Sequence, residues 1–139
     1  MSRTTLLFLI AGLPCLAIVW YLYFAARLKQ FLRDTPAIAS TRDLDAFKVV
    51  VKGQMVAALV QLVLLNVPWI LLIYGYVRTV LHGADALYLL VPNLVVFVLG
   101  KQGKKIEGQA QNLKVADEQL QKERDRVVHI WLHKPFPNW

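Results

Sequence analysis

The chain has 139 residues, of which 57% are hydrophobic, and it carries a formal net charge of +7. This length could form one modest soluble domain, but the hydrophobic residues gather in long uncharged runs that such a domain would not tolerate. The composition therefore excludes an ordinary water-soluble fold and predicts an all-α integral membrane protein.

Two long uncharged stretches occupy the first half of the chain. The first runs from Thr4 to Ala26 and the second from Gly53 to Val77. Each exceeds the roughly 20 residues that cross about 30 Å of hydrocarbon, so we expect transmembrane helices at 4–26 and 53–77. A cleaved signal peptide is the competing interpretation of the first stretch. That stretch is longer than the usual apolar core of about 7 to 15 residues, and no A-x-A-like cleavage site follows it.

A basic segment at 27–52 separates these two stretches and is predicted to be partly helical. Thr35-Pro36 should end the helix that leaves the first span, because the residue before a proline avoids the helical region. The segment Ser40–Asp43 resembles a helix cap. An apolar face then continues toward the second span at helical spacing: Leu44, Phe47 and Val51. The second span should therefore be the end of one longer helix.

A third uncharged stretch, from Ala86 to Gly100, covers only about 22 Å at 1.5 Å per helical residue. Its length alone leaves a re-entrant or interfacial segment open. If the stretch crosses, fourteen Lys and Arg lie on one side of the membrane and two on the other; otherwise the division is six against ten. The positive-inside rule favours the first arrangement. We therefore predict a third transmembrane helix at 84–101, an outside N-terminus and a cytoplasmic tail.

The depths of the three predicted spans hold no Asp, Glu, Lys, Arg or His, which disfavours a proton relay, an ion pathway or a haem site. Their polar side chains are mainly amides that seek partners on neighbouring helices: Gln54, Gln61, Asn66 and Asn93. Asn66 points to a different side of its helix from Gln54, Gln61 and Pro68. Asn66 and Asn93 lie near mid-depth, and we predict that they help hold spans two and three together. A polar ring lining an oligomeric pore is the alternative.

The tail at 102–139 is predicted to be helical, with apolar residues at a seven-residue period: Ile106, Leu113, Leu120 and Val127. A full heptad seam needs a second apolar position, which this segment lacks. We expect an amphipathic helix packed on another subunit or on the first loop, with anionic lipid headgroups as the alternative surface. The terminal rings are predicted to dock on a partner or to anchor at the membrane interface: Trp131, Phe136 and Trp139.

No sequence motif supports an enzyme, so no catalytic residue is predicted. The segment GKQGKK at 100–105 shares only its composition with a phosphate loop, because two residues rather than four separate its glycines. Asp125, His129 and His133 follow one another at i, i+4 spacing and could present metal ligands, but we expect a solvated or partner-contacting face. The single Cys15 cannot form an internal disulfide. No cofactor, metal or nucleic acid is predicted, because acidic lipid or an acidic partner accounts for the positive charge.

These features divide the chain into a three-helix transmembrane domain at 1–101, with a basic cytoplasmic loop at 27–52, and a cytoplasmic helical tail at 102–139. The expected function is that of a non-catalytic subunit that anchors, scaffolds or stabilises a larger complex in a bacterial inner membrane, with a periplasmic N-terminus. Its predicted partners are other membrane-protein subunits, with self-association included, and a bilayer containing anionic lipids. A homo-oligomeric channel or holin-like pore is the alternative.

Overall fold

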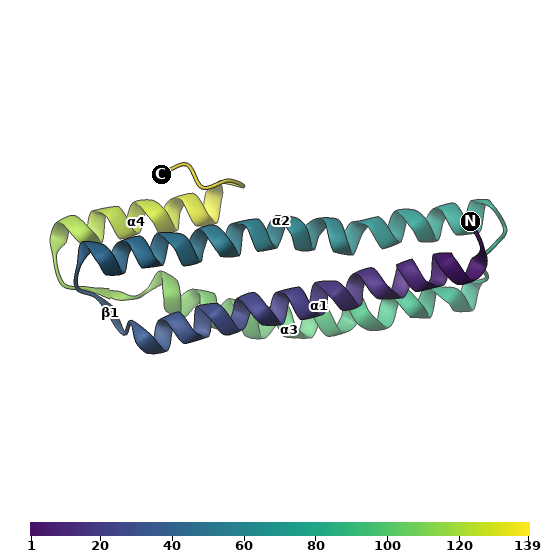
Figure 1. Ribbon diagram of the computed structural model, residues 1–139, viewed down its shortest axis with the longest axis horizontal. Helices are drawn as coiled ribbons and strands as arrows, with labels where there is room; N and C mark the ends of the chain where they lie inside the picture. The colour runs from purple at the N-terminus through teal and green to yellow at the C-terminus, as the bar shows by residue number, and fades with distance from the viewer. The chain divides into compact units, whose positions relative to one another are not determined.

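A computed structural model describes all 139 residues and contains four α-helices (Figure 1). They are α1 (Arg3–Asp34), α2 (Thr41–Val77), α3 (Leu87–Gln111) and α4 (Glu118–His133). The shorter elements are the 3-10 helix η1 (Gly83–Ala86) and the strands β1 (Ala37–Ile38) and β2 (Lys114–Val115). The first three α-helices are long and apolar enough to cross a membrane. The predicted all-α class with three candidate spans is confirmed.

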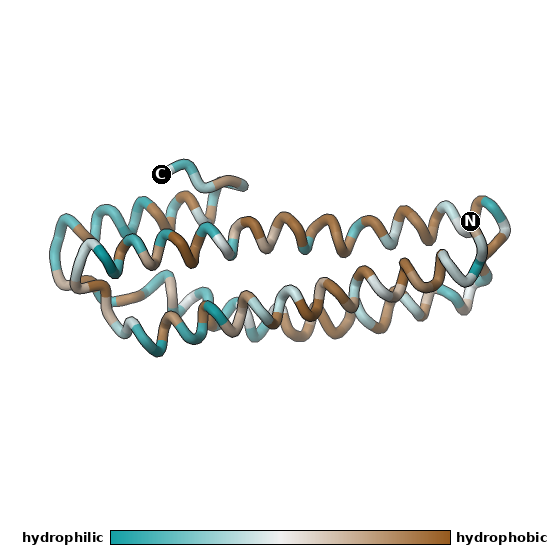
Figure 2. Tube along the Cα trace, in the orientation of Figure 1, coloured by the Kyte–Doolittle hydropathy of each residue, from teal (hydrophilic) through white to brown (hydrophobic).

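The chain forms two compact units. Unit 1 comprises Met1–Leu22 and Val60–Lys101, and unit 2 comprises Tyr23–Leu59 and Gln102–Trp139. Hydrophobic residues follow one another along α1, α2 and α3, whereas α4 is largely hydrophilic (Figure 2). The division of the chain into a membrane domain and a tail after residue 101 stays a prediction.

The start of α2 has the cap that the sequence predicts. The backbone N–H groups of Ala39 and Ser40 donate to Asp43 Oδ2 at 3.1 and 3.0 Å, and the Asp43 N–H donates to Ser40 Oγ at 3.2 Å. These bonds satisfy donors that the first turn of a helix leaves without partners. From this cap α2 continues to Val77 as one helix, which confirms that the second apolar stretch ends a longer helix.

Unit 2 gathers its apolar side chains in one core. α1 ends directly before Thr35-Pro36, as predicted, and β1 follows as an extended segment. β1 pairs in parallel with β2, with Ala37 opposite Lys114 and Ile38 opposite Val115. The buried core comes from the four α-helices, from β1 and from Leu113 between α3 and β2: Leu28, Ile38, Leu44, Phe47, Val51, Met55, Ala110, Leu113, Val127 and Ile130. The predicted apolar face at the start of α2 is therefore confirmed as core.

The tail contains a break that the sequence analysis did not predict. α3 continues to Gln111, the chain passes through β2, and α4 begins at Glu118. Asn112 Nδ2 donates to Gly108 O at 2.8 Å, and Arg124 Nη1 of α4 donates to Gln111 O at 2.7 Å. The bond from Arg124 occupies a carbonyl that the end of α3 leaves without an intrahelical partner. The seven-residue stripe therefore does not lie along one helix, because its members come from α3, the following turn and α4.

Unit 1 has a smaller buried core: Leu6, Ile10, Leu72, Leu81 and Leu89. α2 ends in a turn where Thr79 has a φ of 55° and the N–H groups of Thr79 and Val80 donate to Tyr76 O and Gly75 O. This pattern is a Schellman motif, which reverses the chain at a helix end. A side chain at Gly75 would overlap Leu81. The glycine therefore allows the chain after α2 to fold back onto the helix.

The Asp43 cap predicts a pH dependence. Hydrogen bonding to the Ser40 side chain and the Ala39 N–H lowers the pKa of the Asp43 carboxyl from its ordinary value. The stabilisation is therefore complete above the unfolded-state pKa of about 3.9 and is lost as the pH falls through the lower folded-state pKa. We expect Asp43→Ala to lower the unfolding temperature of the detergent-solubilised protein at pH 7. That difference should shrink below a pH of about 4.

Circular dichroism as a function of temperature measures this effect. Asp45→Ala is the matched control, because it removes a largely exposed carboxylate from the same turn of α2. The Asp45 carboxylate is 3.9 Å from Lys48 Nζ and is itself 75% exposed, so its loss should cost little stability. A deficit of Asp43→Ala that stays constant from pH 7 to acid would contradict a role for the carboxylate charge.

Candidate functional site

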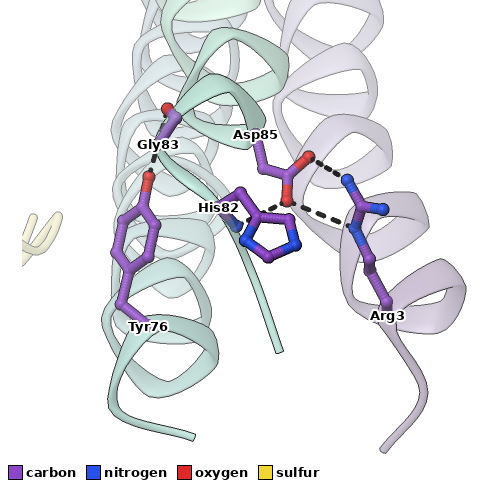
Figure 3. A network of polar contacts seen from close by, with 5 residues as sticks. All are labelled: Arg3, Tyr76, His82, Gly83 and Asp85. Atoms are coloured by element: carbon purple, nitrogen blue, oxygen red, sulfur yellow. Dashed lines mark hydrogen bonds and ion pairs between the residues drawn. The ribbon is translucent and has the colours of Figure 1, made fainter. Parts of the chain in front are cut away.

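Asp85 in η1 is the buried charged side chain of the protein, with 3% of its surface exposed. Its Oδ1 accepts from Arg3 Nη2 at 2.9 Å, and its Oδ2 accepts from Arg3 Nε at 3.3 Å and from the His82 N–H at 2.8 Å (Figure 3). Two parallel bonds from one guanidinium give a strong and oriented ion pair. We call Arg3, His82 and Asp85 the Arg3–Asp85 clamp.

The local sequence explains how η1 presents this carboxylate. Asp85 follows His82 by three residues, and its own N–H donates back to His82 O at 2.9 Å while its side chain accepts the His82 N–H. The Tyr76 hydroxyl, near the end of α2, donates to Gly83 O at 3.4 Å and contacts the same turn (Figure 3). Because α1 begins at Arg3, the clamp joins the first residue of α1 to the turn before α3.

A second contact joins α1 and α3 farther along unit 1. The Tyr21 hydroxyl donates to Leu99 O at 2.9 Å. Arg3 precedes Tyr21 on α1, and Asp85 precedes Leu99 in η1 and α3, so the two helices run in the same direction. The third apolar stretch is therefore held along the same length of unit 1 as α1, which favours a crossing helix over a re-entrant segment.

Two of the predicted amide contacts lie on α2. Gln54 Nε2 donates to Phe24 O of α1 at 2.8 Å, within unit 2. The helices approach closely there, since a Cβ on Gly53 would lie 3.3 Å from Phe24 Cε1. Gln61 is half-buried on α2 within unit 1. The close approach lets the long side chain of Gln54 reach a backbone acceptor on α1.

Asn66 and Asn93 do not bond to each other in the structure. Asn66 Nδ2 donates to Leu62 O at 2.7 Å, and Asn93 Nδ2 donates to Leu89 O at 2.9 Å. Each amide thus bonds the carbonyl four residues earlier on its own helix, which a short Asn side chain reaches without a partner helix. Asn66 is exposed while Pro68 is buried, so Asn66 does point to a different side of α2 from the proline. Asn93 is half-buried.

The predicted docking residues of the tail, except Phe136, pack in the core of unit 2. Leu113 and Val127 are buried there, and four others pack against that core: Ile106, Leu120, Trp131 and Trp139. The same core contains Leu44 and Phe47 from the start of α2. The stripe therefore meets the first loop of its own chain, which is one of the two protein surfaces expected for it. Phe136 is 64% exposed.

The predicted trio on α4 is not assembled as a set of metal ligands. The rings of His129 and His133 stack with centroids 4.5 Å apart, and His133 Nδ1 lies 3.0 Å from His129 O. Asp125 Oδ1 instead lies 2.9 Å from Arg124 Nε. No group of three or more His, Cys, Asp or Glu side chains in the structure could hold a metal ion.

The Arg3–Asp85 clamp was not predicted from the sequence, although the chain contains a signal for it. Asp85 is the only acidic residue between Asp45 and Glu107, and only Arg3 and Arg78 lie on its predicted side of the membrane. A lone carboxylate beside apolar segments is expected to find a cation. The sequence could not distinguish the two candidates. In the structure the Arg78 guanidinium lies 5.7 Å from the centre of the Tyr74 ring instead.

The clamp predicts coupled effects of mutation. Arg3→Gln and Asp85→Asn should each lower the unfolding temperature in detergent, because each leaves a partner without its counter-charge. The double variant should lose less than the sum of the single losses. Arg78→Gln removes the neighbouring cation as a control and should change the unfolding temperature little. Additive losses from the two single variants would contradict a direct pair.

Asp85 also lies in the wall of an open depression of about 590 Å³ within unit 1. The other lining residues come from α1, η1 and α3, and all but Tyr88 have apolar side chains: Ala11, Ala84, Leu87, Tyr88, Val91 and Pro92. Its carboxylate is already committed to Arg3 and the His82 N–H, so the depression offers mainly apolar surface. No protein family model, curated protein or solved structure matches this chain.

Proposed function

We propose that this protein is a non-catalytic integral subunit that anchors or stabilises a larger assembly in a bacterial inner membrane. The observation that supports this best is the role of Asp85, whose carboxylate joins helix ends through Arg3 and the His82 backbone. The three uncharged stretches hold no Asp, Glu, Lys, Arg or His. Membrane helices that move protons or ions usually place such groups at depth. Arg3, Arg78 and Asp85 of unit 1 instead lie near helix ends, and Lys101 lies just after the third uncharged stretch, which supports a structural role.

Charge distribution supports the orientation of the proposed subunit. Unit 2 carries thirteen Lys and Arg and eight Asp and Glu. Unit 1 carries only three Lys and Arg and one acidic residue, Asp85. Under the positive-inside rule the basic loop and the tail lie in the cytoplasm and the N-terminus in the periplasm. The Arg3–Asp85 clamp supports the crossings of α1 and α2, because it requires the start of α1 and the α2–α3 connection to lie on the same side.

Exposed apolar surface supports a place within a larger assembly. In the most apolar 18-residue windows of the three long helices, only 11% to 22% of residues are buried within the protein. α3 is the least buried of the three, with exposed apolar residues on successive turns: Leu87, Leu90, Val91, Leu94 and Phe97. In a bilayer such surface is covered by lipid or by other helices. A subunit built in this way offers most of its helical surface to neighbours.

The C-terminal segment supplies the proposed docking surface in the cytoplasm. Trp131 and Trp139 pack on the core of unit 2, but Leu132 and Phe136 are 56% and 64% exposed. Exposed apolar side chains beside basic residues suit an acidic partner protein or anionic lipid, and nucleic acid is not required to explain the charge. We assign the partner contact to Leu132 and Phe136, because these two are free of the unit's own core.

A homo-oligomeric channel or pore is the second candidate function. One observation favours it: Asn66 is exposed near the middle of the apolar stretch of α2. A ring of such amides from several copies would line a polar path through the membrane. In that case the chain would assemble with copies of itself and would need no other polypeptide.

The proposed orientation predicts the labelling of single cysteines in intact cells. In a Cys15→Ser background, Ser2→Cys should react with a membrane-impermeant maleimide added from the periplasmic side. Asn138→Cys should react only after the inner membrane is permeabilised. Both positions are exposed in the structure. Labelling of Asn138→Cys before permeabilisation would contradict the orientation.

The proposed function predicts co-purification. Extraction in mild detergent followed by mass spectrometry should return other polypeptides together with this chain, and the paired change Leu132→Ala and Phe136→Ala should lower their yield. Val49→Ala is the control, because Val49 is an equally exposed apolar side chain of unit 2. Recovery of this chain alone would contradict the subunit role and favour a pore. If Val49→Ala lowered the yield of the co-purified polypeptides as much as the paired change does, the assigned docking surface would be contradicted.

A further inference from the structure

α2 has two different faces within unit 1. One face packs inward, with Pro68, Leu72 and Gly75 buried. The opposite face is uncovered and carries Asn66 between exposed apolar side chains on the turns before and after it: Leu62, Trp69, Ile70 and Ile73. A polar side chain near the middle of an apolar helical face therefore has no protein neighbour within the chain to cover it.

The amide of Asn66 is only partly satisfied. Its Nδ2 donates one hydrogen to Leu62 O at 2.7 Å, and this is the hydrogen bond that the side chain makes. The other N–H and the Oδ1 acceptor remain available. Asn66 lies near the centre of the uncharged stretch from Gly53 to Val77, a depth at which a bilayer offers no water to satisfy them. A helix that packs on this face must therefore supply an acceptor for the remaining N–H of Asn66 and a donor for its Oδ1.

The spacing of the uncovered face is that of a helix-pairing seam. Leu62, Asn66, Trp69 and Ile73 are separated by four, three and four residues, as alternate core positions of a heptad are. A single Asn in such a seam sets the register and the number of helices that pair, because its amide must meet a matching group. The apolar positions before and after Asn66 provide the packing, and Asn66 provides the specificity.

We propose that α2 pairs with α2 of a second copy of this chain, with Asn66 opposite Asn66 across a two-fold axis. Copies that insert with the same topology have parallel α2 helices, so the two amides lie at the same depth. Each amide then donates its remaining N–H to the Oδ1 of the other, and both polar requirements are met by one contact. A different partner would need its own donor and acceptor at that depth, whereas a second copy supplies them by symmetry.

This pairing goes beyond the proposed subunit role and requires only that α2 crosses the membrane. It also differs from a pore. Two helices in contact along one seam bury the amides between them, whereas a pore would leave the amides facing water. The pair is compatible with a larger assembly, because the exposed apolar surface of α3 is on a different helix.

Cross-linking in membranes tests the seam. In the Cys15→Ser background, Leu62→Cys and Ile73→Cys should form disulfide-linked dimers of this chain when oxidised with copper phenanthroline. Leu94→Cys on α3 is the matched control, since Leu94, Leu62 and Ile73 are 65%, 60% and 61% exposed. We expect this control to stay monomeric. Equal cross-linking of the control, or products containing a different polypeptide instead of dimers, would overturn the proposed pair.

Substitution of the amide tests the contact itself. Energy transfer between labelled copies, diluted in phosphatidylcholine vesicles with phosphatidylglycerol, measures self-association. Asn66→Leu should weaken it by about three- to thirty-fold, the loss expected for one amide contact between membrane helices. Asn66→Gln should retain most of the association, and Asn93→Leu should leave it unchanged. Unchanged association of Asn66→Leu would overturn the proposal, while the co-purification test of the subunit role would be unaffected.

Discussion

Asp85 is buried against apolar elements and needs a cation within reach, and the arrangement of unit 1 depends on how that need is met. Arg3 supplies both bonds from one guanidinium, which brings the first turn of α1 to η1. The Tyr21 contact with Leu99 then holds α1 and α3 parallel over the rest of the unit. α2 runs in the opposite direction, because its Schellman turn reverses the chain before η1. Three helices with alternating direction along the chain follow from these contacts.

The two units are stabilised in different ways. In unit 1 the buried core is small, most apolar side chains of α3 face outward, and named polar contacts hold the helices together. This suits an environment of hydrocarbon, where contact between apolar helices has little advantage over contact with lipid. In unit 2 pieces of all four helices and β1 share one larger core. That core resembles the interior of a water-soluble protein, in which burial of apolar surface is the main favourable term.

The uncovered face of α2 connects the fold with its assembly. Burial of Pro68 and Leu72 on one side turns Asn66 to the other, where its amide makes one hydrogen bond, to Leu62 O of its own helix. In the proposed pair, a second α2 at the same depth supplies a partner for the remaining N–H and the Oδ1 of that amide. Other neighbours could then contact two further exposed regions, which are the apolar surface of α3 and the side chains of Leu132 and Phe136. The proposed self-association and the proposed membership of a larger assembly therefore involve different parts of the molecule.

The sequence by itself determined the elements whose cause is local. Uncharged length predicted the first two long helices, and the distribution of Lys and Arg added the third. Thr35-Pro36 predicted the end of α1, and the Ser40–Asp43 cap predicted the start of α2. Helical spacing also predicted that Asn66 and Pro68 lie on different sides of α2. These features were predictable because backbone preference, capping and periodicity depend on residues within a few positions of one another.

Only the tertiary structure decided which distant groups meet. It selected Arg3 rather than Arg78 for Asp85, and it turned the amides of Asn66 and Asn93 onto their own helices instead of onto each other. It also divided the heptad stripe between α3, a turn and α4, and placed Trp131 and Trp139 on the core of their own unit. The reason is physical: several partners of equal chemistry were available for each group, and only the packing of the helices determines which of them is within reach.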